Sequence, residues 1–522
     1  MQEKISNKKI IARSLASVWH PCTQMKQHEQ FPLVPIQRGE GVWLIDFEGK
    51  RYLDAVSSWW VNLFGHANPR INAALKDQLG QLEHVMLAGF THEPVVQLSE
   101  RLAKLTGLGH AFYGSDGASA VEIALKMSFH YWRNAGKTAK KKFVSLEGSY
   151  HGETIGALSV TDVAIFRDAY GPLLNNNLRV PFPGDEREPL ERSSSRRRLG
   201  PSPVQALENT NGLDSSLRWN DEFLRSRQAP ESGGQASMRL TAANGLANCA
   251  EPHPRPLSPA GRGAQNVPFS RPAGEGLGMR AASVSLENML AEQHHEIAAL
   301  ILEPLVQGAS GMRMYHPDYL RRARALCDKY QVHLIADEIM TGFGRTGTMF
   351  AYEQAGIVPD FVCLSKGLTG GYLPLSCVLT SDAIYDAFYH EDVARAFLHS
   401  HSYTGSALAC RAGLATLDIF ESDDVIAKNR HKAQQFSVHA EAIRRHELVE
   451  NFRHLGMIWA FDVKTAKPTF AREFFAASLK RGVLLRPIGN SVYVMPPYVI
   501  EEDEFAWLVK QTIGVIDEVC SQ

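Results

Sequence analysis

The segment VHLIADE, residues 332–338, indicates the fold class of this chain. Its apolar residues follow one another without alternation, as is typical of strands buried on both faces of a parallel sheet. The pattern returns in KFVSL at 142–146, AALIL at 298–302 and FVCLS at 361–365. Amphipathic runs such as 119–132 alternate with these strands, so the sequence predicts an α/β fold. Because such sheets bind ligands beside the carboxyl ends of their strands, we expect a site there.

Two other stretches stand apart from this pattern. From Trp43 to Val56, apolar positions alternate around a Glu48-Gly49 turn, which predicts a β-hairpin. Residues 184–282 contain SSSRRR and PHPRPLSPAGRG and almost no periodic apolar pattern, which predicts a disordered insertion. The insertion is either a regulatory or partner-binding arm or a surface insertion without a role, and we favour the second interpretation.

The overall composition excludes several classes of partner. Lysine and arginine total 55 against 56 acidic residues, so no net field attracts nucleic acid or a membrane surface. No apolar run reaches the roughly 18 residues of a membrane span, and the N-terminal stretch lacks the apolar core of a signal peptide. The seven cysteines have no paired spacing, which is typical of free thiols in a reducing compartment. We expect a cytoplasmic protein.

Histidine spacing gives no reason to expect a metal. His294-His295-Glu296 and His399-Ser400-His401 lack both an H-E-x-x-H pair and a supporting carboxylate cluster. The glycine-rich run Gly342–Gly347 matches G-x-G-x-x-G, but no helix follows it convincingly and the acid expected about 20 residues later is missing. We therefore expect neither a metal nor a dinucleotide site.

Lys366 is the first residue that suggests chemistry. It follows the apolar strand FVCLS directly and precedes a glycine-rich turn, which places its amine at the edge of the sheet. Lysines mostly stay solvated, so a lysine here either extends to solvent or acts as the partly desolvated nucleophile of a Schiff base.

Asp337 and Glu338 end the neighbouring apolar strand, where two acids are poor packing choices. A carboxylate can hold a pyridine nitrogen in its protonated form, which makes a pyridoxal ring a stronger electron sink. Asp337 and Ile339 share one face by the two-residue strand period, so Ile339 can pack on that ring. The alternative is an acid pair that caps a helix or meets a surface arginine.

Two further segments supply contacts for an anionic cofactor. Asp116, Gly117 and Ala118 open a predicted helix, whose first N–H groups can bind a phosphate, although the same residues also suit an ordinary N-cap. Tyr150 follows the strand KFVSL and can stack on a cofactor ring or cap a turn.

With these residues in hand, the chain resembles the class III aminotransferases, which are fold-type I pyridoxal-phosphate enzymes. The likeness covers nearly everything outside the insertion. It implies a large domain with a mostly parallel seven-stranded sheet and a smaller α+β domain from the two chain ends. The motifs that carry it are WHP (19–21), SSWW (57–60), YHG (150–152), EP (303–304), GMRMYHP (311–317), ADEIMTGFGRTG (336–347), the Lys366 segment and RPIGNSVYVMPPY (486–498). The implied segments are 1–70 and 421–522 for the small domain, and 71–183 and 283–420 for the large one.

The resemblance also implies roles for single residues. Lys366 would form the Schiff base with pyridoxal 5'-phosphate and carry the proton, Asp337 would hold the pyridine nitrogen, and Tyr150 would act as the third catalytic residue. Tyr150 and Ile339 would enclose the ring. The other implied contacts are to the phosphate through the amides of Asp116, Gly117 and Ala118 and through Ser402 of a neighbouring subunit, and to substrate through Trp59, Tyr150, Arg345, Lys366, Ser400 and Arg486.

The implied activity is a transamination in two half-reactions within a homodimer that shares its active sites. The members most similar in their motifs take the amino group from S-adenosylmethionine and give it to 8-amino-7-oxononanoate. Lysine, a diamine or an ω-amino acid is the alternative donor, and a mutase, a decarboxylase and a scaffold without cofactor are the other classes considered. The chain departs from the family pattern at Cys22, where relatives often have tyrosine, and at Ser402, where they often have threonine.

Overall fold

The computed structural model describes residues 6–31, 33–184 and 277–520. These residues fall within one compact unit of the chain, and a second unit, residues 190–259, lies outside the described ranges. The predicted disorder of the insertion at 184–282 therefore concerns residues that lie mostly outside the described part of the chain.

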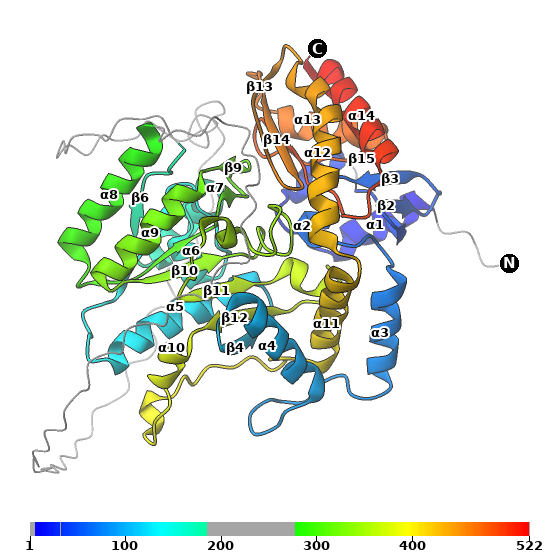
Figure 1. Cartoon of the computed structure of the whole chain (residues 1–522). Coiled ribbons are helices and arrows are strands. Elements are labelled where there is room, and N and C mark those ends of the chain that lie inside the picture. The colour runs from blue at the N-terminus through cyan, green and yellow to red at the C-terminus, as the bar shows by residue number, and fades with distance from the viewer. Residues whose placement is uncertain (1–5, 32, 185–276, 521–522) are drawn as a thin grey trace, which may run out of the picture. The chain divides into compact units, whose positions relative to one another are not determined.

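A seven-stranded sheet forms the centre of the larger part of the described unit (Figure 1). Strand β12 is antiparallel to both of its neighbours, and the remaining pairs are parallel. This confirms the predicted α/β class with a mostly parallel sheet. In spatial order the strands are β4 (His110–Gly114), β12 (Ser376–Thr380), β11 (Phe361–Leu364), β10 (His333–Asp337), β7 (Ile297–Leu302), β5 (Lys142–Leu146) and β6 (Leu178–Val180).

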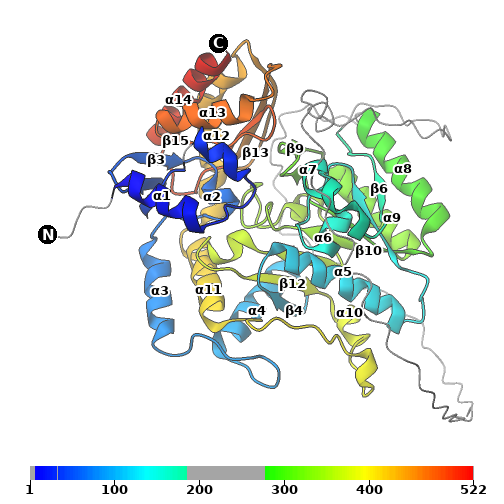
Figure 2. The ribbon, with the colours of Figure 1, turned by 180° about the vertical axis from the view of Figure 1, so that it is seen from behind.

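Helices cover both faces of this sheet, which explains the uninterrupted apolar runs. Neighbouring residues of one strand point to opposite faces. Ile335 packs in one core cluster with residues of α5 (Gly117–Asn134), whereas Leu334 belongs to a second cluster with residues of α9 (Pro317–Tyr330). Figures 1 and 2 show α5 and α9 on opposite sides of the sheet. All five residues of β10 are buried, so the strand needs apolar residues on both faces.

Helix α8 (Leu277–Gln293) corrects the predicted end of the insertion. The insertion was expected to extend to residue 282, but the helix begins at Leu277. Met279, Ala282 and Leu286 are buried at helical spacing, and α8 packs against α9 and β6. The prediction was wrong here because residues 277–282, LGMRAA, are too few and too mixed to show a periodic apolar pattern.

The two ends of the chain come together in the smaller part, as expected. The predicted hairpin is present as β2 (Trp43–Asp46) and β3 (Arg51–Asp54), and β15 (Val483–Leu484) pairs in parallel with β3. A second sheet contains β13, β14 and β16. The other elements of this part are α1 (Asn7–Ser17), β1 (Ile36–Glu40), α12 (Val425–Arg444), β13 (Val449–Leu455), β14 (Ile458–Val463), α13 (Phe470–Lys480), β16 (Ser491–Val494) and α14 (Glu502–Cys520).

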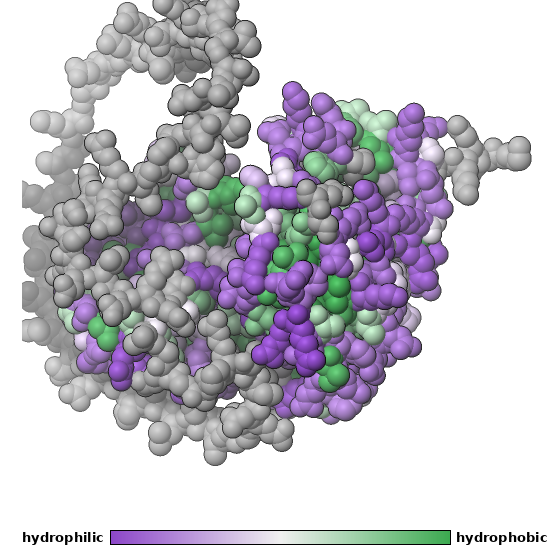
Figure 3. Space-filling view, turned by 90° about the horizontal axis from the view of Figure 1, so that it is seen from above, coloured by the Kyte–Doolittle hydropathy of each residue, from purple (hydrophilic) through white to green (hydrophobic). Residues whose placement is uncertain are grey.

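Between these parts of the chain, α11 (Ala407–Ser422) packs against α3 (Pro69–Leu79) and α4 (Glu93–Thr106). The view from above shows that the exposed described residues are mainly hydrophilic, with apolar residues in small groups (Figure 3). Among the described residues, no helix combines the length and the apolar character that crossing a membrane requires. The run Gly342–Gly347 forms turns, and the next helical element is the short 3-10 helix η5 (Ala351–Ala355), so no helix follows the run directly.

Candidate active site

Lys366 lies at the carboxyl end of β11, in a strained position. Its backbone has a φ of 43°, and its Nζ lies 4.7 Å from the centroid of the Trp60 ring. Burial lowers the pKa of the Lys366 amine to about 8, while the nearby carboxyl groups of Asp337 and Glu303 oppose this shift. A lysine with this pKa has a substantial neutral fraction near pH 7–8, so its amine can act as a nucleophile and as a base.

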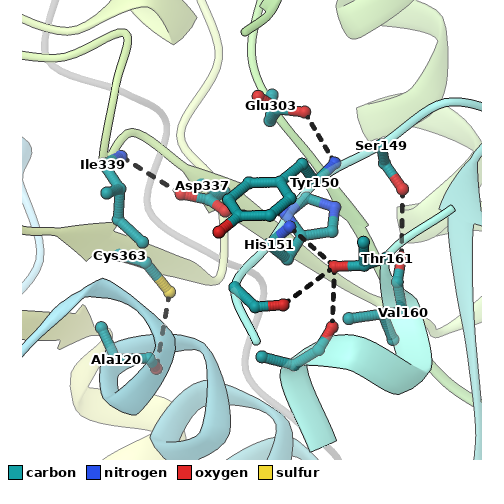
Figure 4. A network of polar contacts seen from close by, with 12 residues as sticks. Ala120, Ser149, Tyr150, His151, Val160, Thr161, Glu303, Asp337, Ile339 and Cys363 are labelled. Carbon is teal, nitrogen blue, oxygen red and sulfur yellow. Dashed lines mark hydrogen bonds and ion pairs between the residues drawn. The ribbon is translucent and has the colours of Figure 1, made fainter. Parts of the chain in front are cut away.

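Asp337 ends the neighbouring strand β10, and both of its carboxylate oxygens have partners (Figure 4). The backbone N–H of Ile339 donates to Oδ1 at 3.2 Å, and Nδ1 of His151 lies 2.7 Å from Oδ2. Because an ionised carboxylate only accepts hydrogen bonds, a bond between these two atoms requires a proton on Nδ1 of His151. The buried Nε2 of His151 has no hydrogen-bond partner among the described residues.

Our sequence interpretation missed His151 as a site residue. It lies next to Tyr150 in the YHG motif, and its side chain is fully buried against Asp337. A histidine that follows a buried strand and a glutamate-glycine turn was a usable signal. The pairing itself was not predictable, because it joins residues 186 positions apart.

Glu303 is a second buried acid beside Lys366. It follows β7, and its carboxyl group accepts hydrogen bonds from the backbone N–H groups of Tyr150 at 3.0 Å and Gly308 at 2.9 Å. Burial raises the pKa of Glu303 to about 7, with His151 opposing and Asp337 adding to the shift. The sequence interpretation used Glu303 only as part of a family motif and did not predict its hydrogen bond to the Tyr150 backbone.

Tyr150 follows β5 at the same edge of the sheet. Its hydroxyl donates to Oε1 of Glu153 at 2.9 Å, and its ring lies 5.3 Å from that of Phe166. Burial, followed by the bond to Glu153, raises the pKa of the Tyr150 phenol. Figure 4 shows Tyr150 above His151, with Glu303 and Asp337 nearby. The phenol is therefore protonated at neutral pH and acts as a hydrogen-bond donor.

The start of α5 comes close to these residues, as the sequence predicts. Asp116 is the N-cap, and its side chain accepts from Ser119 N–H at 2.9 Å. A Cβ atom on Gly117 would lie 3.0 Å from Cγ2 of Ile339, and one on Gly152 would lie 2.6 Å from Cβ of Ala118. The helix start thus lies against both the Asp337 segment and the Tyr150 segment. Its first-turn N–H groups lack intrahelical acceptors, so they can bind an anion.

Trp59 and Arg486 are exposed, and Trp59 adjoins Trp60, whose ring contacts Lys366; we call this exposed pair the mouth of the site. The guanidinium carbon of Arg486 lies 4.9 Å from the centroid of the Trp59 ring, which is 44% exposed. Nη2 of Arg486 also donates to the carbonyl of Cys22 at 3.4 Å. The backbone of Cys22 therefore borders the site, although the family tyrosine is absent. An exposed arginine in this place is free to bind a carboxylate in a bidentate manner.

Three predicted substrate or cofactor residues are not placed against this cluster. Arg345 is 1% exposed, and its guanidinium donates to the carbonyls of Trp60, Asn62 and Pro496 rather than facing the site. Ser400 and Ser402 are exposed on the segment that follows Leu398. In that segment His401 reaches the residues before α5, because its Nδ1 lies 3.3 Å from Oγ of Ser115.

Comparison with known proteins gives a consistent result. The family model "Aminotransferase class-III" matches residues 23–213 and 242–516. The chain is 40% identical to the adenosylmethionine-8-amino-7-oxononanoate aminotransferase of Helicobacter pylori, covering 98% of each chain. It is 34% identical to the enzyme of the same name from Geobacter sulfurreducens, covering 94% of each.

Solved structures agree with the sequence relatives. The adenosylmethionine-8-amino-7-oxononanoate aminotransferase of Methanocaldococcus jannaschii aligns with a TM-score of 0.77 at 29% identity, over 98% of this chain and 100% of that one. An omega transaminase from Pseudomonas jessenii, solved in complex with PMP, aligns with a TM-score of 0.78 at 24% identity, over 98% of each chain. The second likeness concerns the fold alone.

Proposed function

The chain belongs to the class III aminotransferases, and we propose that it transfers the amino group of S-adenosylmethionine to 8-amino-7-oxononanoate, which gives 7,8-diaminononanoate for biotin biosynthesis. The observation that carries the catalytic part is the Lys366 amine, whose pKa is about 8 and which lies near Asp337 at the sheet edge. The choice of substrates follows the relatives that match the chain almost from end to end and are named for this reaction.

The residues present fit pyridoxal 5'-phosphate. Asp337 has its carboxylate fixed by His151 and by the backbone of Ile339, which suits a group that holds a pyridinium nitrogen. Gly117 has no side chain, and a Cβ atom there would meet Ile339. The backbone of the first turn of α5 is therefore uncovered at this point and can approach a phosphate closely. The bound cofactor supplies an electron sink that stabilises negative charge at the substrate carbon.

Lys366 is the group that moves protons in this proposal. A base works best when its pKa lies near the operating pH, because both protonation states are then populated. At a pKa of about 8, the amine of Lys366 meets this condition, whereas a solvated lysine near 10.4 does not. Asp337 and Glu303 keep the protonated form accessible, so the same amine can accept a proton and return it.

Substrate recognition is assigned to the mouth of the site. Arg486 would bind the carboxylate that both substrates carry, with its planar donors in a bidentate arrangement. The exposed face of Trp59 would contact the sulfonium nucleoside, with a cation–π attraction of about 0.5–2 kcal/mol on the general scale. Unchanged donor selectivity in Trp59→Leu would count against this contact.

Assembly as a cytoplasmic homodimer is part of the proposal. Exposed Met86, Phe90, Leu398 and Tyr403 form two apolar segments, and these segments adjoin because a Cβ atom on Gly405 would meet Leu87. Apolar side chains gathered in this way are typical of a protein interface. A second copy seated here would bring Ser402 towards the phosphate region of its partner.

Another class III aminotransferase that uses lysine, a diamine or an ω-amino acid as donor is the second candidate. The same cofactor residues would serve it. A donor assay separates the two functions: purified protein with pyridoxal phosphate and 8-amino-7-oxononanoate receives S-adenosylmethionine, lysine or 4-aminobutyrate in turn, and 7,8-diaminononanoate is measured by mass spectrometry. Product with S-adenosylmethionine alone is the expected result, and product only with lysine or 4-aminobutyrate would overturn the choice of donor.

A further inference from the structure

Residues Ser57–Trp60 (α2) form a turn with a left-handed backbone conformation. All four have positive φ values, 51° for Ser57, 48° for Ser58, and 72° for both Trp59 and Trp60. The turn closes with a hydrogen bond from Val61 N–H to Ser57 O at 3.0 Å. L-amino acids avoid consecutive left-handed residues because Cβ crowds the following carbonyl oxygen, and none of the four is glycine. Tertiary contacts must therefore hold this turn.

The turn places two indole rings against the two cations of the site. Nζ of Lys366 lies 4.7 Å from the Trp60 ring, which packs edge-on against Tyr493. The guanidinium of Arg486 lies 4.9 Å from the Trp59 ring. A right-handed turn at these residues would point both rings elsewhere. The left-handed conformation therefore determines where the substrate-facing aromatic groups lie.

Asp54 binds the beginning of the turn. Its carboxylate accepts the Ser58 N–H at 2.9 Å and the Ser58 hydroxyl at 2.6 Å, and Nε2 of His66 lies 3.0 Å from the same carboxylate. Asp54 is fully buried. His66 is fixed in turn by Asn62, whose Nδ2 lies 3.1 Å from its Nδ1. The carboxylate thus ties the strained residue Ser58 to a rigid neighbourhood.

Arg345 binds the end of the turn. Its guanidinium donates to the carbonyls of Trp60 at 3.4 Å and Asn62 at 2.9 Å, and to Pro496 at 2.9 Å. It also lies 4.8 Å from the Tyr498 ring. Burial lowers the pKa of the Arg345 guanidinium, while Tyr498 and Asp54 oppose that shift. The buried guanidinium of Arg345 therefore lies near enough to Asp54 to interact with it, while the two side chains bind opposite ends of the turn.

We propose that Asp54 and Arg345 are positioning residues that clamp the left-handed turn from its two ends and so hold Trp59 and Trp60 in place for substrate binding. The effect on catalysis rests on the proposed aminotransferase function, whereas the clamp itself does not. Arg345 then influences the substrate through the carbonyl of Trp60 and not by touching it. The hydrogen bonds of Asp54 and Arg345 include none to α5 or to Asp337, so a change in the clamp should affect the substrate more than the cofactor.

The first test compares Asp54→Ala with Asp46→Ala in the full chain. Asp46 is a matched control because it is also buried and accepts hydrogen bonds from Glu48, Lys50 and Tyr52, none of which belongs to the turn. Both variants should unfold at lower temperature. Asp54→Ala alone should change the near-ultraviolet circular dichroism of the tryptophans in the protein without cofactor, and should raise KM for S-adenosylmethionine about tenfold, which equals about 1.4 kcal/mol.

A rescue variant separates the clamp from ordinary stability. Glycine adopts positive φ without steric cost, so Ser58→Gly relieves part of the strain that Asp54 offsets. The double variant Asp54→Ala/Ser58→Gly should therefore recover part of the dichroism signal and of the KM. A wild-type KM in Asp54→Ala, or no recovery in the double variant, would overturn the proposal. If Asp54→Ala does not fold, Ser58→Ala removes only the 2.6 Å hydrogen bond and should give a smaller change of the same kind.

The second test uses Arg345→Lys, which keeps the charge but cannot donate to three carbonyls in one plane. Arg324→Lys is its control, because Arg324 is also buried and pairs with Asp360 instead of with the turn. Arg345→Lys should raise KM by a larger factor than it weakens the affinity for pyridoxal phosphate, whereas Arg324→Lys should change stability only. Equal KM changes in both would contradict the clamp. If S-adenosylmethionine is not the donor, the dichroism change still tests the clamp, so the two failures can be told apart.

Discussion

At the scale of single residues, Lys366 and its neighbours determine the chemistry. Burial disfavours the charged amine, and two carboxyl groups favour it, with burial as the larger effect. The result is an amine that titrates near neutral pH. Asp337 and Glu303 are both buried acids. Each is tolerated in the interior because its carboxyl group accepts two hydrogen bonds.

The pKa of Lys366 gives a prediction about cofactor capture. Only the neutral amine attacks the aldehyde of pyridoxal phosphate, so in the protein without cofactor the rate should rise with pH and level off above about 8. A solvated lysine would place this midpoint near 10.4. Stopped-flow absorbance at a series of pH values measures the rate. Lys140→Met is the control, because Lys140 also has a lowered pKa but bonds to the carbonyls of His294 and Ile297, and its loss should not move the midpoint. A midpoint above 10 would contradict the account.

The pair formed by His151 and Asp337 gives a second prediction. Replacing His151 with phenylalanine removes a hydrogen bond to a charged group, which is worth about 1.5–3 kcal/mol, so pyridoxal phosphate should bind about tenfold to about a hundredfold more weakly. Equilibrium dialysis of the protein without cofactor measures this. His333→Phe is the control, since His333 is buried at the other end of the same strand. Similar losses in both variants would show that His151 acts only through stability.

At the scale of the elements, close contacts between backbones assemble the site. Gly152 has a φ of 121°, and a Cβ atom there would lie 2.6 Å from Cβ of Ala118 and 2.9 Å from its Cα. The segment after β5 and the start of α5 can therefore meet only because one of them carries no side chain at this point. This contact joins the segment of Tyr150, which would flank the cofactor ring, to the residues that would hold the phosphate.

Gly152→Ala should disrupt this junction. The added methyl group must displace α5, and overpacking of this kind costs about 1–3 kcal/mol, apart from the backbone strain. Gly136→Ala is the matched control, because Gly136 also has a positive φ of 74° but open space around it. Gly152→Ala should lower both the melting temperature and the cofactor affinity, and Gly136→Ala only the melting temperature. Unchanged cofactor affinity in Gly152→Ala would contradict the assigned junction.

How far the sequence predicts an element depends on what holds that element in place. The strands β7, β10 and β11 were predictable because burial on both faces demands apolar runs. The turn Ser57–Trp60 was not predictable from the sequence. Its left-handed backbone conformation is one that these residues disfavour locally, and it depends on contacts with Asp54 and Arg345. For the same reason Arg345 was assigned to the substrate, although the structure places its guanidinium on backbone carbonyls. The start of α8 was misjudged because residues 277–282 are too few and too mixed to show a periodic apolar pattern.

At the scale of the whole molecule, the exposed apolar segments bear on assembly. The net charge of −1 neither favours nor opposes self-association. The apolar segments around Met86 and Leu398 are exposed, with Leu398 at 77%. If a second copy of the chain covers these segments, its Ser402 would also contribute to the proposed phosphate site.

Leu398→Lys tests this assembly. A charge in the apolar contact should shift the protein from dimer to monomer in sedimentation velocity, and weaken the binding of pyridoxal phosphate. Val438→Lys is the control, because Val438 is 75% exposed on α12 and should change neither property. A wild-type chain that sediments as a monomer while binding the cofactor tightly would contradict the shared site.

The central claim, an aminotransferase that works through Lys366 with S-adenosylmethionine as donor, is tested most directly by one absorbance spectrum. The purified protein is loaded with pyridoxal phosphate, and S-adenosylmethionine is added without any acceptor. We expect the visible band of the lysine-bound cofactor to disappear in favour of the near-ultraviolet band of the aminated cofactor, and Lys366→Ala to show neither the first band nor the change. A visible band that persists in the presence of S-adenosylmethionine would contradict the proposed donor, and the absence of any band in the wild-type protein would contradict the assignment of the site.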